Sequence, residues 1–177
     1  DYVDDTEGAL QAYLIAARRA PRNPFVLYRV GRSLTEVERH REALTWYDRA
    51  ARADPAWSFP WHGRALSLRD LGRFDDAIAA MHEAIAREPG RARYRGNLAS
   101  LLAEAGRPDE ALRLVEALVR DFPEYLPGWF NLAVARLQQG DSDGARAALA
   151  RAEALSDTTP AQRASIASLR RQLERAA

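Results

Sequence analysis

The chain has 177 residues, a formal net charge of +1 and no cysteine. A charge so near zero gives no general attraction to nucleic acid or to an anionic membrane surface. The absence of cysteine excludes a disulfide framework and a zinc site built on cysteine. No apolar run of about 18 residues is present, so we expect no direct membrane insertion. The near-zero net charge likewise leads us to expect no nucleic-acid partner.

The first predicted helix lies within residues 1–23 and begins at about Thr6. Apolar residues fall on one of its faces at helical spacing, namely Leu10, Tyr13, Leu14 and Ala17. No partner helix precedes it in the sequence, so its other flank is expected to be exposed. Self-association through this unpaired N-terminal helix is therefore one interaction that the sequence leaves open.

Four pairs of amphipathic helices follow, each pair joined by a short turn. The predicted pairs are 24–37 with 41–53, 58–71 with 75–87, 92–105 with 108–121, and 126–139 with 143–155. A last helix starts after Thr159, because threonine caps a helix, Pro160 suits the first turn and Gln162 can reach back to the cap. It has a single apolar face, as the end of a helical stack requires.

Several residue types recur at an interval of 34 positions. The recurring prolines are Pro21, Pro55, Pro89 and Pro123. The recurring alanines on the second helices are Ala9, Ala43, Ala77, Ala111 and Ala145. The turn glycines are Gly72, Gly106 and Gly140. Registered columns at one period indicate a repeat protein, in which each helix pair buries its apolar faces against its neighbours.

These columns resemble the tetratricopeptide repeat (TPR) family, which also places a large residue before a small one in the first helix, as in Trp61 with Ala65 and Trp129 with Ala133. The resemblance implies an all-α fold, a right-handed α-solenoid of antiparallel helix pairs with a C-terminal capping helix. It further implies one array over residues 1–177. Its expected parts are the second helix of a truncated repeat in 1–23, repeats in 24–57, 58–91, 92–125 and 126–157, and a capping helix in 158–177.

One turn departs from the pattern, because Glu38 stands where the other repeats have a turn glycine. Glycine at the end of a helix commonly adopts the left-handed backbone conformation. We therefore predict that Glu38 adopts this conformation, at a cost of about 1 kcal/mol for a residue with a Cβ.

The alanines of the helix expected at 75–87 separate into two groups by register. Ala77 belongs to the repeating column and is predicted to be buried where two helices touch, so that a larger side chain there would overpack. Ala80 is predicted to lie on the outer face of the same helix.

No arrangement of residues indicates catalysis. The histidines His40, His62 and His82 lack the spacing of a metal site or of a catalytic dyad. The acid pairs, such as Asp75 with Asp76, fall at helix starts, where their negative charge interacts favourably with the helix dipole. We therefore expect no enzyme activity, no cofactor and no metal.

The family resemblance implies that one face of the first helices lines a concave groove that binds peptides. Transferred to this sequence, the groove residues are Phe25, Tyr28, Arg29, Arg32, Phe59, His62, Arg69, Arg93, Asn97, Phe130, Asn131, Val134 and Leu137. Asn97 and Asn131 stand where the family often has an asparagine bonding a peptide backbone. Trp57 and Tyr125 are expected in the inter-repeat loops beside this face. As an alternative, Phe130, Val134 and Leu137 are covered by the chain's own terminal helix.

Two functions remain open at this point. The first is a protein–protein interaction scaffold that binds a peptide or a partner helix in the groove. The second is a structural module packed against an upstream catalytic or membrane domain of a longer protein. We expect a cytoplasmic location, while an upstream targeting or anchoring segment stays open because the sequence does not begin with Met.

Overall fold

The computed structural model describes residues 2–155 and 159–175. In this part of the chain all regular structure is α-helical, in ten helices. The chain divides into two compact units, Asp1–Gly90 and Arg91–Ala177. The all-α fold class expected from the sequence is confirmed.

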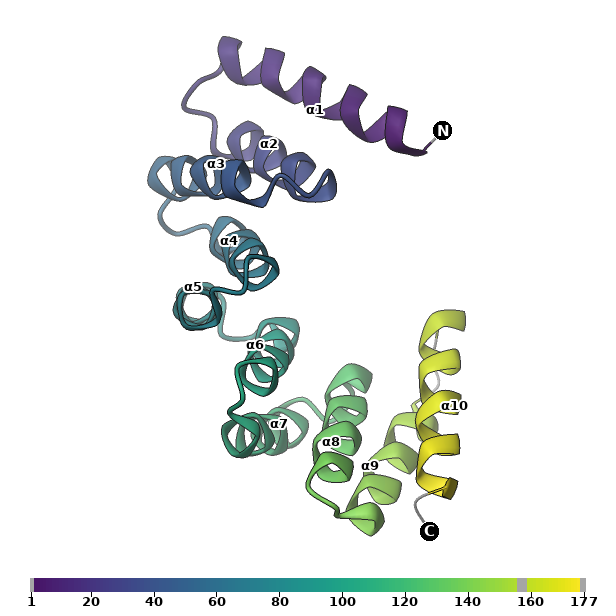
Figure 1. The fold of residues 1–177 in the computed structure, drawn as a ribbon. Helices are drawn as coiled ribbons and strands as arrows, with labels where there is room; N and C mark the ends of the chain where they lie inside the picture. Colours follow the sequence, from purple (N-terminus) through teal and green to yellow (C-terminus); the bar gives the residue numbers. More distant parts are fainter. Residues whose placement is uncertain (1, 156–158, 176–177) are drawn as a thin grey trace. The chain divides into compact units, whose positions relative to one another are not determined.

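The first unit holds five helices that stack in chain order (Figure 1). They are α1 (Tyr2–Arg19), α2 (Pro24–Glu36), α3 (His40–Ala53), α4 (Ser58–Asp70) and α5 (Phe74–Arg87). Helix α2 pairs with α3 and α4 with α5, while α1 packs on α2 and α3 packs on α4. Each element therefore contacts its neighbours in sequence, as a repeat stack requires.

The second unit repeats this plan with two further pairs and a terminal helix. Its helices are α6 (Ala92–Glu104), α7 (Pro108–Asp121), α8 (Leu126–Gln138), α9 (Ser142–Ala154) and α10 (Pro160–Arg175). Helix α10 packs against both α9 and α8. Its buried residues are Ile166, Leu169 and Leu173, the single apolar face predicted from the sequence.

The predicted helix boundaries of the four pairs are confirmed to within one residue. Outside these pairs, the predicted start of the first helix is wrong, because α1 begins at Tyr2 and not at about Thr6. The four residues before Thr6 include neither glycine nor proline, so nothing in them breaks the helix. The cap predicted at the last helix is present: Thr159 Oγ1 accepts from the Gln162 backbone N–H at 3.2 Å, and Gln162 Oε1 accepts from the Thr159 N–H at 2.8 Å.

The left-handed turn at Glu38 is confirmed. Its φ is +60°, close to the +71°, +75° and +80° of Gly72, Gly106 and Gly140. In both turns of the first unit the next backbone N–H bonds back to the end of the helix. The Arg39 N–H donates to the Leu34 carbonyl at 2.8 Å, and the Arg73 N–H donates to the Leu68 carbonyl at 2.9 Å. Glu38 therefore adopts the glycine geometry with a side chain attached.

The cores combine large apolar side chains with alanines at the repeating positions. Ala43, Ala77 and Ala145 are fully buried, which lets neighbouring helices approach closely. The prediction for Ala80 is wrong, because its side chain is only 1 % exposed. Residues three apart lie on one face of a helix, so Ala80 shares the buried side of Ala77.

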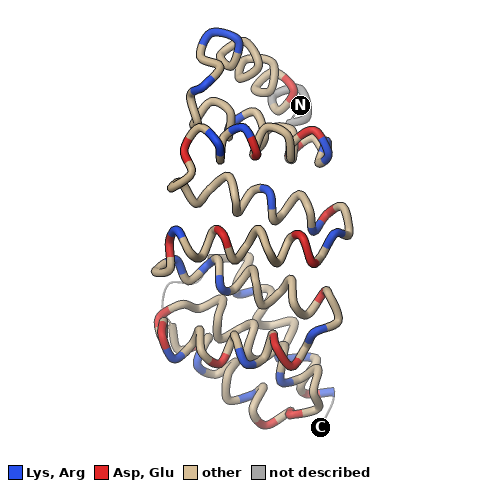
Figure 2. The backbone as a smooth tube through the Cα atoms, turned by 90° about the vertical axis from the view of Figure 1, so that its left-hand side faces the viewer, with Lys and Arg blue, Asp and Glu red and all other residues tan. Residues whose placement is uncertain are grey.

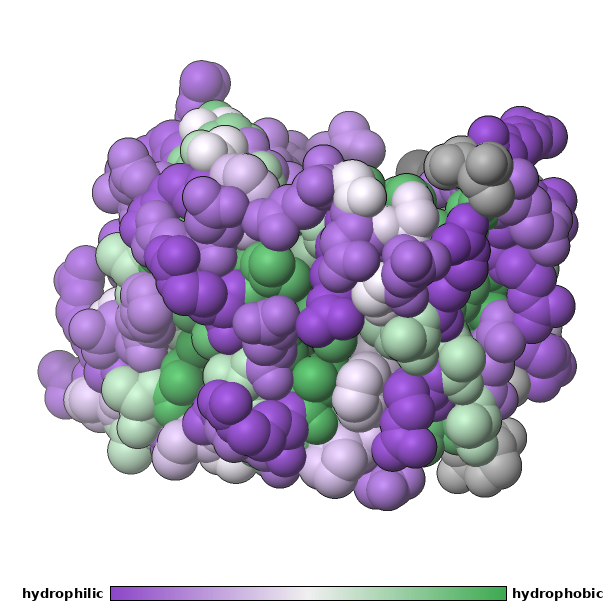
Figure 3. Space-filling view, turned by 90° about the horizontal axis from the view of Figure 1, so that it is seen from below, coloured by the Kyte–Doolittle hydropathy of each residue, from purple (hydrophilic) through white to green (hydrophobic). Residues whose placement is uncertain are grey.

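Charged residues of both signs are mixed over the surface. Arginines and acidic residues alternate along the helices of both units (Figure 2). On the face seen in Figure 3, hydrophobic residues appear as narrow strips between hydrophilic ones.

Candidate functional site

Four aromatic side chains gather at the starts of α2 and α4 in the first unit. They are Phe25, Tyr28, Trp57 and Phe59, named here the aromatic cluster. Trp57 lies between the other three, with ring centroids 6.4 Å from Phe25, 5.0 Å from Tyr28 and 5.7 Å from Phe59. The Tyr28 and Phe59 rings meet edge to face at 5.9 Å. Such offset and edge-to-face pairs stabilise one another beyond the apolar area that they bury.

Local structure fixes the position of this cluster. The Asn23 side chain caps α2 by accepting from the Val26 N–H at 3.2 Å, and Trp57 occupies the N-cap position of α4. Phe25 and Phe59 follow these caps at the same place in their repeats. The packing of α3 on α4 brings the two helix starts together, so the cluster is a product of the repeat stack.

The cluster is partly open to solvent. Phe25 is 55 % exposed. In the described part of the chain, the other exposed large hydrophobic residue is Ile15, at 51 %. Next to Phe25 lies Arg29, whose guanidinium carbon is 4.5 Å from the centre of the Tyr13 ring and 5.9 Å from that of Phe25. A cation over aromatic faces is attracted by their quadrupoles, which holds Arg29 in place.

The other basic groove residues of the first unit are engaged within the chain. Arg32 Nε donates to Glu36 Oε1 at 2.9 Å, and this bond raises the pKa of the Arg32 guanidinium. Arg69 Nη2 pairs with Asp70 Oδ1 at 2.9 Å. Both ion pairs face water and are worth little to stability. They nevertheless reduce the positive charge that a ligand would meet.

His62 lies deeper than its place in the predicted groove suggests. The side chain is only 8 % exposed, so it offers little area to a ligand. A polar contact that the sequence did not indicate lies between α2, α3 and α4. The Tyr47 hydroxyl lies 3.1 Å from Thr35 Oγ1, which also lies 3.1 Å from Ser67 Oγ.

This hydroxyl cluster is also tied to the backbone of α2, because the Thr35 hydroxyl lies 3.0 Å from the Gly31 carbonyl, which can only accept. Burial raises the pKa of the Tyr47 phenol well above its ordinary value. The cluster therefore stays neutral and ties α2, α3 and α4 together.

In the second unit two predicted groove residues meet at one cavity. Asn131 and Val134 of α8 line a cavity of about 240 Å³ together with Ser100 of α6. Among the remaining predicted residues, Arg93 is exposed and Asn97 is half-buried on α6. An amide beside an apolar wall is suited to hold a peptide backbone, because it both donates and accepts.

The apolar end of the predicted groove lies close to the terminal helix. Phe130 lines a cavity of about 180 Å³ whose other wall includes Ala161, Ser165 and Ile166 of α10. Val134 and Leu137 are partly buried against the core that contains Ile166, Leu169 and Leu173. Phe130 therefore lies beside α10, as the alternative expects, whereas Val134 also lines the separate cavity beside Asn131.

Two further findings concern the described residues alone. None of their helices has both the length and the apolar character needed to cross a membrane. Among them no three of the histidine and acidic side chains gather as ligands for a metal ion would.

Comparison with known proteins identifies the class. The tetratricopeptide repeat model matches residues 2–56, 62–125 and 97–160. The chain therefore belongs to the tetratricopeptide repeat family, whose members are typically protein–protein interaction modules. A search of curated proteins gave no match.

Solved structures share this α-solenoid fold at low sequence identity. MamA from Desulfovibrio magneticus RS-1 is 18% identical, with 86% of this chain and 88% of that chain covered and a TM-score of 0.75. TTC0263, a thermophilic TPR protein of Thermus thermophilus, is 18% identical, with coverages of 95% and 92% and a TM-score of 0.75. YrrB, described as a TPR protein with an unusual peptide-binding site, is 19% identical, with coverages of 96% and 86% and a TM-score of 0.71.

Proposed function

We propose that this chain is a protein-interaction scaffold that binds an extended peptide or a partner helix through the aromatic cluster of its first unit. The observation that carries the proposal is the 55 % exposure of Phe25 in contact with Trp57. Exposed aromatic side chains that sit in a packed surround are the usual anchors of protein interfaces. An apolar side chain of the partner would cover Phe25 and complete the cluster.

The surroundings of Phe25 favour binding because they are already ordered. Tyr28, Trp57 and Phe59 hold one another in ring contact, and Arg29 is held by Tyr13. A partner therefore meets a surface whose side chains have lost most of their rotamer freedom before binding, which reduces the entropic cost of association.

Asn131 and Val134 in the second unit extend the proposal to a separate surface. Their cavity of about 240 Å³ offers the side-chain amides of Asn131 and Gln138 and an apolar wall. The peptide-binding site described for YrrB is a property of that protein, and it supports peptide binding here only as an analogy.

The test is selection of peptides from a random library on the wild-type protein, followed by titration of the enriched peptide. Replacing Phe25 or Trp57 with alanine should weaken its binding at least about tenfold, or about 1.4 kcal/mol. Ile15→Ala is the matched control, since Ile15 is also an exposed large hydrophobic residue of the first unit. Equal loss in all three variants, or none in the first two, would reject the aromatic cluster as the binding surface.

A second candidate function, assembly through α1, is favoured by the 51 % exposure of Ile15. An apolar side chain on the flank of α1 could be covered by a second copy or by an adjoining domain. Light scattering at increasing concentration measures the solution mass. Self-association predicts a dimer that Ile15→Glu dissociates, whereas a monomer at every concentration excludes it.

A further inference from the structure

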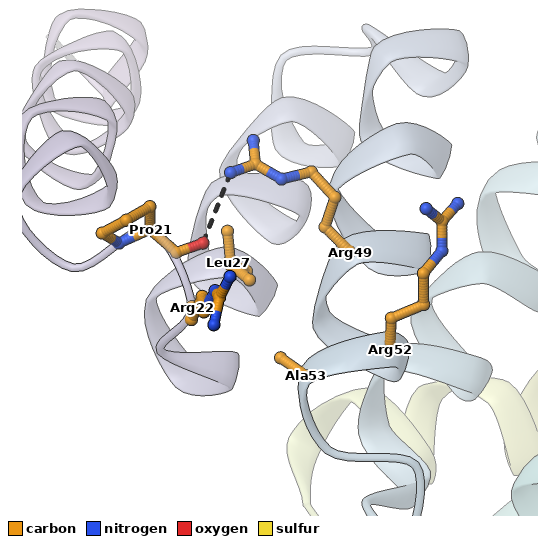
Figure 4. A pocket seen from close by; sticks show the side chains of 6 residues that line it. All are labelled: Pro21, Arg22, Leu27, Arg49, Arg52 and Ala53. Atoms are coloured by element: carbon orange, nitrogen blue, oxygen red, sulfur yellow. Dashed lines mark hydrogen bonds between the residues drawn. The ribbon is translucent and has the colours of Figure 1, made fainter.

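The first unit contains a cavity of about 460 Å³ whose lining includes no residue of the aromatic cluster (Figure 4). It lies between the loop that joins α1 to α2 and the last turns of α3. Its lining residues are Pro21, Arg22, Leu27, Arg49, Arg52 and Ala53. Half of these side chains are arginines, and no acidic residue lines the cavity.

The first complete repeat has a smaller residue at this cavity where two others have tryptophan. Leu27 corresponds to Trp61 and Trp129 at the period of 34 residues. The Trp129 indole N–H donates to the Pro123 carbonyl at 2.7 Å. Trp61 is covered by the guanidinium of Arg87, 4.4 Å from its ring. Leu27 has no polar group that could make such a bond, and its side chain lines the cavity together with Pro21.

The arginines of the cavity are not neutralised by the chain. Arg22, Arg49 and Arg52 form no ion pair with the residues that the structure describes. Asp54, the next residue after Ala53, uses one carboxylate oxygen to accept from the Ala56 N–H at 3.1 Å. The carbonyl end of α3 opposes an anion with a partial charge of only about −0.5, which three guanidinium groups outweigh.

One of these arginines is held in a fixed position. The guanidinium carbon of Arg49 lies 4.2 Å from the centre of the Trp46 ring, and its Nη2 donates to the Pro21 carbonyl at 3.5 Å. Figure 4 shows the side chain reaching from α3 across to Pro21, while Arg22 comes from the loop and lies beside Leu27. The two elements therefore present guanidinium groups around one opening.

The positions of Arg22, Arg49 and Arg52 are not all basic in the other repeats. One period later the corresponding positions hold Ala56, Glu83 and Ala86. Three periods later they hold Glu124, Arg151 and Ala154. Two periods later they hold Gly90, Ala117 and Arg120. Of the four repeats, only the first complete one therefore has arginine at all three positions.

We propose that this cavity binds a phosphate monoester. A guanidinium group presents paired N–H donors that match phosphate oxygens, and several arginines suit a group with nearly two negative charges. The space exceeds what a bare anion needs and falls within the range of small-molecule sites. Leu27 and Pro21 supply an apolar wall for the carbon part of the ester.

The experiment titrates wild-type protein with three probes: inorganic phosphate, O-phosphoserine and an alanine-flanked phosphoserine peptide. Serine and the unphosphorylated peptide serve as controls for the two esters. Calorimetry or arginine side-chain NMR reports binding. Both esters should bind, and Leu27→Trp should weaken them at least about tenfold without changing the charge, because the indole fills the cavity. Arg22→Ala and Arg52→Ala should weaken them as well.

Two matched variants separate this site from other effects. Arg41→Ala removes an exposed arginine of α3 outside the cavity and should leave binding unchanged. Phe25→Ala should also leave it unchanged, so failure of the peptide-binding surface and failure of this site are distinguishable. If Leu27→Trp does not fold, the exposed Arg22 and Arg52 variants supply the test.

The probes also identify the source of the phosphate. Tighter binding of the peptide indicates a phosphorylated protein, whereas equal binding of O-phosphoserine indicates a small phosphorylated molecule. Binding to Leu27→Trp as tight as to wild type would overturn the proposal, because the attraction would then be a diffuse effect of surface arginines. Absence of binding by both esters would overturn it too.

Discussion

The ring of Tyr47 fills the space that a side chain on Gly63 would need: a Cβ at Gly63 would lie 2.5 Å from Tyr47 Cζ. The same ring lies against Gly31, where a Cβ would be 2.9 Å from two of its carbons. Tyr47 of α3 is therefore seated between the backbones of α2 and α4. The lack of a side chain at both glycines makes this close approach possible.

Gly63→Ala should lower the free energy of unfolding by about 1–3 kcal/mol, because the rigid ring cannot move away without disturbing the helices around it. Chemical denaturation measures the change. Gly8→Ala is the control, since a Cβ there meets nothing within 4 Å and alanine favours the helix. A Gly63→Ala protein as stable as Gly8→Ala would show that Tyr47 has room to shift.

Glu38→Gly should leave the free energy of unfolding unchanged or raise it by up to about 1 kcal/mol. The φ of +60° strains a residue with a Cβ, and glycine removes the strain. Gly72→Ala, at a φ of +71°, should lower it by a similar amount. A clear loss of stability in Glu38→Gly would mean that its side chain contributes more than the strain costs.

Ala77→Leu and Ala80→Leu should each lower the free energy of unfolding by about 1–3 kcal/mol, since both side chains are buried and added methylene groups overpack the helix contacts. Ala79, which lies between them in sequence and is exposed, supplies the control as Ala79→Leu. Melting curves of the three variants compare their stabilities. Similar melting temperatures for Ala79→Leu and Ala80→Leu would contradict the buried position of Ala80.

Stability should fall as pH rises above about 10, the ordinary pKa of tyrosine. Burial raises the Tyr47 pKa in the folded state, so above pH 10 the unfolded chain releases a proton that the folded chain retains, and this favours unfolding. Below that pH the contribution is fully present. Tyr47→Phe should be less stable at neutral pH, since it loses the bond to Thr35, but its stability should fall less steeply above pH 10. Equal slopes for both proteins would show that other groups set the alkaline limit.

The features that local chemistry controls could be predicted from the sequence. The spacing of apolar residues, the prolines and the turn residues determine where each helix begins and ends, and these boundaries are confirmed to within one residue except at α1. The left-handed turn at Glu38 follows from the same local rules, because a helix end of that form needs one residue at positive φ whichever side chain it carries.

The candidate site was predicted less completely. Register predicts Phe25, Tyr28 and Phe59 on one face and Trp57 in the loop beside it. The ring contacts that Trp57 makes with all three depend on how this loop packs on α2. The depth of His62 and the hydroxyl cluster of Tyr47, Thr35 and Ser67 depend on contacts between residues that are 12 and 32 positions apart in sequence. No local pattern carries that information.

By itself the sequence determined the helices, their order and their repeating contacts, because a period of 34 residues and short turns leave few ways to bury the apolar faces. Tertiary structure alone decided which surfaces stay open. Phe25 remains exposed because its neighbours pack beside it without covering it, whereas Phe130 lies against α10. The cavity at Leu27 likewise appears only in three dimensions, since an unfilled space depends on every side chain around it.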